Sequence, residues 1–319
     1  MIRYVARRLL GVVPTLLLLV LLTVVLTRLM PGDVIDQLLL ERAADDNARQ
    51  QLESLLGLDK SLPVQYVDYI KDAMRGDLGE SLIEHRPVLR MIGERVNISI
   101  ELASFSLIVA WTFGATVGTL SAMYQNRPLD YLLRAVAVLG LTVPTFALGV
   151  AVVLLPAIWW RWSPPLSYVS FTENPVAHLK QFILPALVLG FATAGSIMRL
   201  TRTTMLEVLR QDYVRTAHAK GLRGIVVVTR HAVRNALVPV LSVFGLQVAS
   251  LLSGAVIIES IFALPGMGRL MLGAVEGRDY PVIQGVTLMV GVFVMLVNLL
   301  VDLSYPFIDP RIKAAGKAL

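Results

Sequence analysis

The sequence predicts an all-α protein whose helices cross a membrane six times. Hydrophobic residues make up 55% of the 319 residues, charged residues only 16%, and the mean hydropathy of +0.68 is too high for an ordinary water-soluble domain. Six stretches without a charged residue are close to, or longer than, the roughly 20 apolar residues that a helix needs to cross a bilayer. They are residues 9–27, 102–126, 135–160, 181–198, 235–258 and 280–301.

The first stretch follows three arginines, Arg3, Arg7 and Arg8, as the apolar part of a secretory signal would. However, it is about as long as a full membrane span, and the residues after it, from Arg28 to Asp33, do not form a small-residue cleavage site. We therefore expect a retained membrane helix. Prolines in or beside the stretches predict kinks. They are Pro14, Pro144, Pro156, Pro185 and Pro239.

Two short amphipathic helices are predicted between the first and second stretches. Residues 48–56 place Leu52, Leu55 and Leu56 at helical spacing, and Pro63 suits the first turn of a second helix. The sequence Gly76-Asp77-Leu78-Gly79 should end that second helix. Before the last stretch, Pro265-Gly266 predicts a tight turn followed by a short apolar helix in the outer interface.

The basic residues predict the orientation. They gather at the N-terminus, in the second and fourth connections and in the C-terminal tail, which six spans would place on one side of the membrane. The positive-inside rule makes that side cytoplasmic, so both termini are expected inside the cell. The net charge of +6 then reflects topology rather than nucleic-acid binding, and the expected environment is membrane lipid.

The fourth connection contains the strongest candidate for a functional surface. Leu206, Leu209, Tyr213 and Ala217 recur at steps of three and four, which predicts a helix over about 206–222 that ends at Gly221. Ala217 and Gly221 lie four residues apart and leave that face almost without side chains, so another protein could approach closely. The alternative is a solvated basic connector between membrane helices.

A family resemblance favours the first interpretation. Arg215-Thr216-Ala217, three further residues and Gly221 resemble the EAA loop of ATP-binding cassette (ABC) importer permeases, whose pattern is Glu-Ala-Ala, three residues, Gly. Arg215 and Thr216 depart from that pattern. The surrounding residues, Asp212 to Ala217 and Ala219 to Leu222, are similar to the peptide and nickel branch of the family.

Other motifs extend the resemblance to nearly the whole chain. Arg7-Arg8-Leu9-Leu10, Leu29-Met30-Pro31-Gly32-Asp33 and Gly76-Asp77-Leu78-Gly79-Glu80-Ser81 are similar to the dipeptide/oligopeptide/nickel permease family. The same is true of the sequence from Phe262 to Leu270 and of Asn298 to Leu303.

The resemblance implies a type I ABC importer permease of the bacterial inner membrane. The N-terminal helix and extracytoplasmic segment would occupy residues 1–96, a five-helix permease core 97–308, and a cytoplasmic tail 309–319. The implied partners are a second, related permease subunit, two cytoplasmic ATPase subunits and a solute-binding protein. ATP and Mg²⁺ would bind to the ATPases, and this chain would hold no cofactor or metal.

The resemblance also implies two sets of contact residues. The residues expected to couple to the ATPases are Asp212, Tyr213, Arg215, Thr216, Ala217, Lys220, Gly221 and Leu222. Those expected near the solute-binding protein are Gly76, Asp77, Pro265, Gly266 and Gly268.

Several function classes fit the sequence less well. It contains no Gly-x-x-x-x-Gly-Lys-Ser/Thr phosphate loop and no His-Glu-x-x-His motif, which argues against an ATPase and against a membrane hydrolase. An ion-coupled secondary transporter should carry ionisable groups or broken helices at mid-membrane, and the six stretches carry no charge there. A structural membrane scaffold is harder to exclude by chemistry, and it ranks lower only because the permease motifs match over so much of the chain. For the cargo, di- or oligopeptides are expected, and nickel, glutathione and haem are the alternatives.

Overall fold

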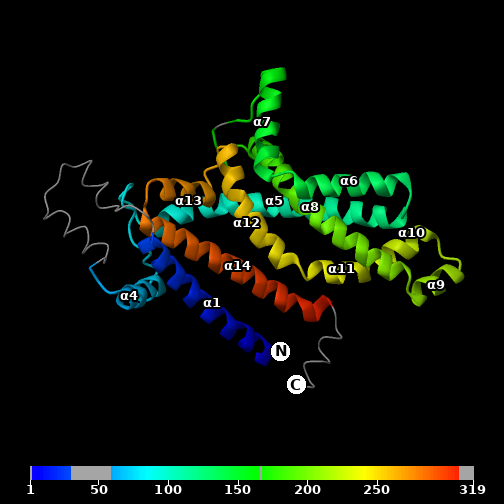
Figure 1. The fold of residues 1–319 in the computed structure, drawn as a ribbon, viewed down its shortest axis with the longest axis horizontal. Coiled ribbons are helices and arrows are strands. Elements are labelled where there is room, and N and C mark those ends of the chain that lie inside the picture. Colours follow the sequence, from blue (N-terminus) through cyan, green and yellow to red (C-terminus); the bar gives the residue numbers. More distant parts are fainter. Residues whose placement is uncertain (1, 30–58, 166, 309–319) are drawn as a thin grey trace. The chain divides into compact units, whose positions relative to one another are not determined.

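The computed structural model describes residues 2–29, 59–165 and 167–308, and every regular element in these ranges is a helix (Figure 1). The helices before the third connection are α1 (Ile2–Leu29), α4 (Leu62–Met74), α5 (Val88–Met123), α6 (Pro128–Thr142) and α7 (Thr145–Trp160). They are followed by α8 (Pro175–Leu209), α9 (Asp212–Ala219), α10 (Gly224–Val226), the π-helix η1 (Val227–Ala232), α11 (Val233–Leu241), α12 (Phe244–Ile261), α13 (Met267–Glu276) and α14 (Tyr280–Ile308).

The chain divides into two compact units. The first comprises Met1–Asn97 and Arg269–Leu296, and the second comprises Ile98–Gly268 and Val297–Leu319. The domain boundaries predicted at residues 96 and 308 are based on expected function, whereas these two units are defined by packing. The predicted boundaries therefore stay predictions.

The first unit is held together by close approach of membrane helices. A Cβ atom at Gly285 of α14 would lie 2.6 Å from Cγ1 of Val88 on α5, and one at Gly291 would collide with Leu19 of α1. Small residues allow membrane helices to pack this tightly. The amphipathic helix α4 lies against α1, where the Tyr66 hydroxyl donates a hydrogen bond to the Leu17 carbonyl.

The prediction for this outer segment is confirmed where the structure describes it. α4 carries Pro63 in its first turn, and the chain leaves the helix through Gly76, whose φ of +80° favours glycine. The helix predicted over 48–56 lies outside the described residues.

The second unit is built around α8, which packs against α6, α7, α11 and α12. Its core combines Leu102 of α5, Phe182 and Leu189 of α8, and Leu251 and Ile258 of α12. Glycines again set the helix spacing between α5 and α8. A Cβ atom at Gly190 would lie 2.6 Å from the Ser106 carbonyl oxygen, and one at Gly118 would lie 2.6 Å from that of Met198.

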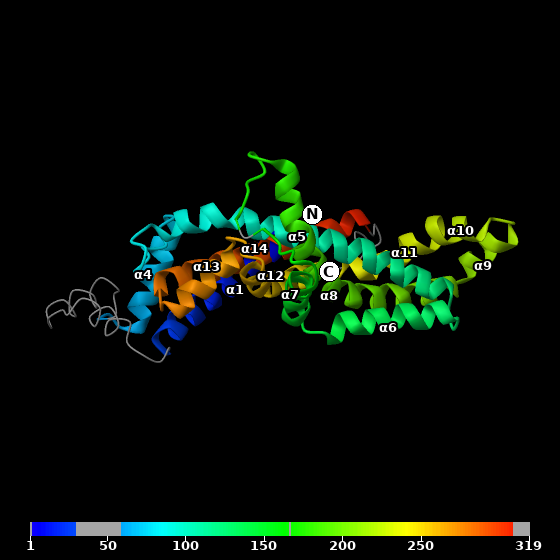
Figure 2. The same cartoon turned by 90° about the horizontal axis from the view of Figure 1, so that it is seen from above.

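The third apolar stretch is bent rather than straight. α6 and α7 meet at an angle of 99°, and Figures 1 and 2 show α7 turning away from the line of α6. Pro144 lies at the corner because it lacks an amide hydrogen and cannot continue α6. The kink predicted at this proline is confirmed. Pro14, Pro156 and Pro185, by contrast, lie inside helices that continue through them.

The fifth apolar stretch differs from its prediction. Instead of one helix over 235–258, the chain forms a helix over Gly224–Leu241 and a second over Phe244–Ile261. The last turn before the break follows Pro239, whose carbonyl accepts hydrogen bonds from both the amide and the hydroxyl of Ser242. These short-range bonds tighten and end the helix. The sequence did not indicate this break, because the apolar run continues through it without a charged residue.

The membrane-spanning prediction is otherwise confirmed. Within the described residues, five helices are long and apolar enough to cross a bilayer, and the bent pair α6 and α7 raises the number to six. The described apolar part of α1, Gly11–Val25, is shorter. The orientation of the termini stays a prediction.

Candidate functional site

The candidate coupling segment, defined here as Asp212 to Leu222, is a separate short helix. α8 ends at Leu209, Gln211 adopts an extended conformation with ψ of 149°, and α9 begins at Asp212. The single helix predicted over 206–222 is therefore wrong. Leu206 and Leu209 fit the same periodicity because they occupy the last turns of α8, against which the segment packs.

Ala217 faces the interior of its own chain. Its exposed fraction is only 7%, and it packs with Val214 of α9 and Val227 of η1. The interpretation of Ala217 as an exposed docking position is a further error. Its small side chain instead lets α9 approach η1 closely.

Gly221 has the conformation that the sequence predicts. Its φ is +75°, and two hydrogen bonds close the helix: the Gly221 amide donates to the His218 carbonyl, and the Leu222 amide donates to the Ala217 carbonyl. This is a Schellman motif, which requires a left-handed residue at the position after the C-cap. A Cβ atom at Gly221 would meet no atom within 4 Å, so the glycine is required by the backbone and not by packing within the chain.

The exposed face of the segment is mainly polar and basic. Seven of the predicted residues are exposed there: Asp212, Tyr213, Arg215, Thr216, Lys220, Gly221 and Leu222. Arg215 Nη1 lies 3.5 Å from Asp212 Oδ1, and the Thr216 hydroxyl donates to the Asp212 carbonyl. The side chains of Arg215 and Asp212 are at least three-quarters exposed, so this ion pair adds little stability by itself.

The segment is attached firmly at its base. Val208 and Leu209 of α8 pack on the cluster formed by Val214, Ala217 and Val227. Asn235 of α11 donates a hydrogen bond of 3.2 Å to the Tyr213 hydroxyl. The neighbouring η1 is a π-helix, a form that often occurs at functional sites. α9, η1 and the end of α8 thus form one packed element (Figure 1).

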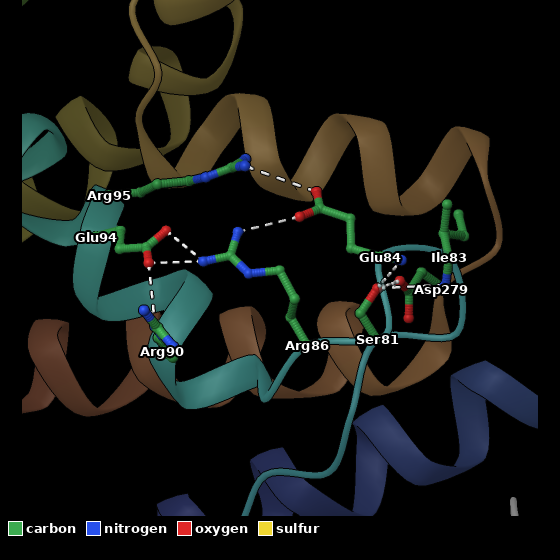
Figure 3. Close-up of polar contacts among 8 residues, drawn as sticks. All are labelled: Ser81, Ile83, Glu84, Arg86, Arg90, Glu94, Arg95 and Asp279. Carbon is green, nitrogen blue, oxygen red and sulfur yellow. Dashed lines mark hydrogen bonds and ion pairs between the residues drawn. The ribbon is translucent and has the colours of Figure 1, made fainter.

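Of the residues predicted near a solute-binding protein, Gly76 and Asp77 are exposed. The chain after them is fastened by Ser81, whose hydroxyl donates to Asp279 Oδ2 at 2.5 Å and accepts the amides of Ile83 and Glu84 (Figure 3). Asp279 Oδ1 also accepts the Leu82 amide. These hydrogen bonds fix the loop after α4 to the turn before α14.

An exposed network of charges continues from this loop. Arg86 binds Glu94 through one nitrogen at 2.6 and 2.8 Å and Glu84 through the other at 3.3 Å (Figure 3). Arg90 and Arg95 complete the network. Hydrogen bonds to Glu94 and Glu84 raise the pKa of Arg86 above its usual value, because both carboxylates stabilise the charged guanidinium.

Gly266 and Gly268 are buried, which corrects their interpretation as partner contacts. A Cβ atom at either position would collide with the carboxylate of Glu259. Glu259 itself is 0% exposed and accepts hydrogen bonds from the Ser99 hydroxyl at 2.6 Å and the Gly268 amide at 2.8 Å. The two glycines make room for this carboxylate. Pro265 is partly buried.

The sequence interpretation missed the polar clusters of the second unit. Glu259 directly follows the fifth apolar stretch, and it is fully buried. His178 precedes the fourth apolar stretch and lies in the first turns of α8, with Nε2 at 2.9 Å from Glu101 and Nδ1 at 2.9 Å from the Val169 carbonyl. Asp130 and Arg202 form a third cluster. The only sequence signal for these residues is their position beside an apolar stretch.

The described residues place no group of three or more His, Asp or Glu side chains where it could hold a metal ion.

Comparison with known proteins shows the family. The model for the binding-protein-dependent transport system inner membrane component matches residues 114–314, and the model for the N-terminal part of such membrane components matches residues 1–103. This chain belongs to that family. It is accordingly a multi-pass protein of the bacterial inner membrane and a component of a transport system.

Full-length relatives narrow the branch. The chain is 42% identical over 317 residues to a putative peptide permease protein of Brucella suis biovar 1. It is 39% identical to the dipeptide transport system permease protein of Escherichia coli K12 and to the glutathione transport system permease protein of Pectobacterium atrosepticum. Each alignment covers 98% of this chain and 99% of the relative.

A solved structure supports the fold. The crystal structure of an amino acid ABC transporter with histidines matches with a TM-score of 0.53 at 11% identity, covering 68% of this chain and 93% of the other. The predicted permease fold is therefore confirmed.

Proposed function

We propose that this family member is a permease subunit of an ATP-driven importer and forms half of the pathway for short peptides. The observation that carries the proposal is the full-length similarity, at 39–42% identity, to permeases whose names specify a peptide, a dipeptide or glutathione. These three kinds of solute all contain peptide bonds.

A complete transporter would contain this chain, a second and different permease subunit, two ATPase subunits and a solute-binding protein. ATP and Mg²⁺ would bind to the ATPases, and this chain would carry out no hydrolysis. The exposed residues of the coupling segment would contact an ATPase. Ala217 would hold the segment in place through its buried packing against η1. Gly76 and Asp77 would lie near the solute-binding protein.

Uptake into proteoliposomes tests the proposal. The chain is reconstituted with the permease and ATPases encoded beside it, and the binding protein loaded with radiolabelled dialanine is added outside. We expect uptake that requires ATP and is abolished when the ATPases are omitted. Uptake driven by an ion gradient without the ATPases would contradict the proposal and indicate a secondary transporter.

Glutathione is the second candidate cargo, because one full-length relative is a glutathione permease. Competition distinguishes the two cargoes. Unlabelled glutathione should reduce the uptake of labelled dialanine only slightly if the transporter is specific for peptides, and almost completely if it is specific for glutathione. Nickel and haem are tested in the same competition.

A further inference from the structure

A buried ion pair joins three helices close to the coupling segment. Asp130, in the first turn of α6, is 0% exposed. Arg202 of α8 donates to both of its oxygens, from Nε to Oδ1 at 3.0 Å and from Nη2 to Oδ2 at 2.8 Å. The Ser121 hydroxyl of α5 donates to Oδ1 at 2.5 Å, and the Asn126 amide donates to Oδ2 at 3.0 Å. Every helix that meets here is therefore bonded to one carboxylate.

The two-pronged geometry makes this contact rigid. An arginine that binds both oxygens of a carboxylate fixes orientation as well as distance, whereas an apolar contact allows the two surfaces to slide. The helices are also tightly packed around the ion pair, since Gly118 lets the backbones of α5 and α8 come into direct contact beside Arg202. α6 therefore cannot slide along α8 while the ion pair is intact.

The same part of α8 also carries the coupling segment. Arg202 lies less than three turns before the end of α8, and Met205 and Leu209 between these points pack on η1 and α9. A displacement of the coupling segment reaches α8 through the packing of Val214 and Ala217 on Val208 and Leu209, and α8 is continuous from there back to Arg202.

We propose that the Asp130–Arg202 pair clamps the ends of α5 and α6 to the part of α8 that carries the coupling segment, so that these helices move as one body. Asp130 and Arg202 are then positioning residues for ATP-coupled transport. This inference rests on the proposed function, because it assigns the path by which movement at the coupling segment reaches the membrane helices.

Three variants test the clamp in the complete reconstituted transporter. Arg202→Lys keeps the positive charge but cannot bind both carboxylate oxygens through two nitrogens. Asp130→Asn keeps the shape of the side chain but removes its negative charge. The double variant Asp130→Leu/Arg202→Met replaces the pair with apolar side chains, which often preserves folding. Arg86→Lys is the matched control, because Arg86 also binds a carboxylate by several contacts, but its ion pair with Glu94 is partly open to solvent, whereas Asp130 is fully buried.

The measurement is dialanine uptake per ATP hydrolysed, with the amount of folded transporter as a second readout. We expect this ratio to fall about tenfold in Arg202→Lys and in the apolar double variant, within the range of typical coupling free energies, while ATP hydrolysis continues. The control should keep the wild-type ratio. If Asp130→Asn does not fold, the other two variants still decide the outcome.

Two results would overturn the inference. One is a parallel loss of uptake and hydrolysis at an unchanged ratio, which indicates a purely structural pair. The other is a wild-type ratio in the double variant, which indicates that packing alone suffices. Both differ from failure of the proposed function, which would appear as absent ATP-dependent uptake in the wild-type transporter.

Discussion

Substitutions at Gly221 can separate backbone strain from contact with an ATPase. At φ of +75°, an L-residue costs about 1–2 kcal/mol relative to glycine. No atom lies within 4 Å of the Cβ position, so in this chain alone a large side chain adds little to that strain. Gly221→Ala therefore measures the strain, and Gly221→Trp measures the strain together with bulk at the exposed surface.

We expect Gly221→Ala to reduce ATP-dependent dialanine uptake by no more than about thirtyfold, because the strain is at most about 2 kcal/mol and each 1.4 kcal/mol corresponds to a factor of ten. Gly221→Trp should reduce it at least about tenfold further and should also weaken copurification of the ATPase subunits, since an indole group would occupy the docking surface. Gly221→Asn is the mild control, because asparagine tolerates the left-handed conformation. Equal uptake by the alanine and tryptophan variants would refute a partner contact at this position.

Three further substitutions test packing through the thermal stability of the purified protein. Ala217→Leu should destabilise it by about 1–3 kcal/mol through overpacking, and the exposed Thr216→Leu should not; equal effects would contradict the burial of Ala217. Gly118→Ala should lower the stability by a similar amount, because its methyl group would meet the backbone of α8. Gly93→Ala is the control and should leave the stability unchanged, because no atom lies within 4 Å of that Cβ position. Unchanged stability of Gly118→Ala would contradict the close helix contact. Glu259→Ala should cost about 1–3 kcal/mol for each donor left unpaired, and more than Glu259→Gln; a neutral alanine variant would contradict its buried hydrogen bonds.

The apolar stretches and the local turn signals could be predicted because they depend on neighbouring residues. Pro144 marks a corner, Pro63 a helix start, and Gly221 a helix end, and each acts through its own backbone. The division between α8 and α9 could not be predicted, since the spacing of Leu206 and Leu209 suits a helix that continues to Gly221 as well as one that ends at Leu209.

The buried polar residues were beyond local reasoning for a different reason. Asp130 meets Arg202 across 72 positions, and Glu259 meets Ser99 across 160. Their burial depends on which helices pack together, which periodicity does not encode. Gly266 and Gly268 show the consequence: they have the appearance of an exposed turn in the sequence, yet they surround a carboxylate that comes from α12.

The glycine contacts between α5 and α8 also limit where this chain can bend. Where Gly118 and Gly190 bring two backbones together, no layer of side chains remains that could change rotamers and absorb a small displacement. Such a joint can only stay closed or separate completely. Gradual flexing within the second unit is consequently left to places where a helix already stops, such as residues 242–243.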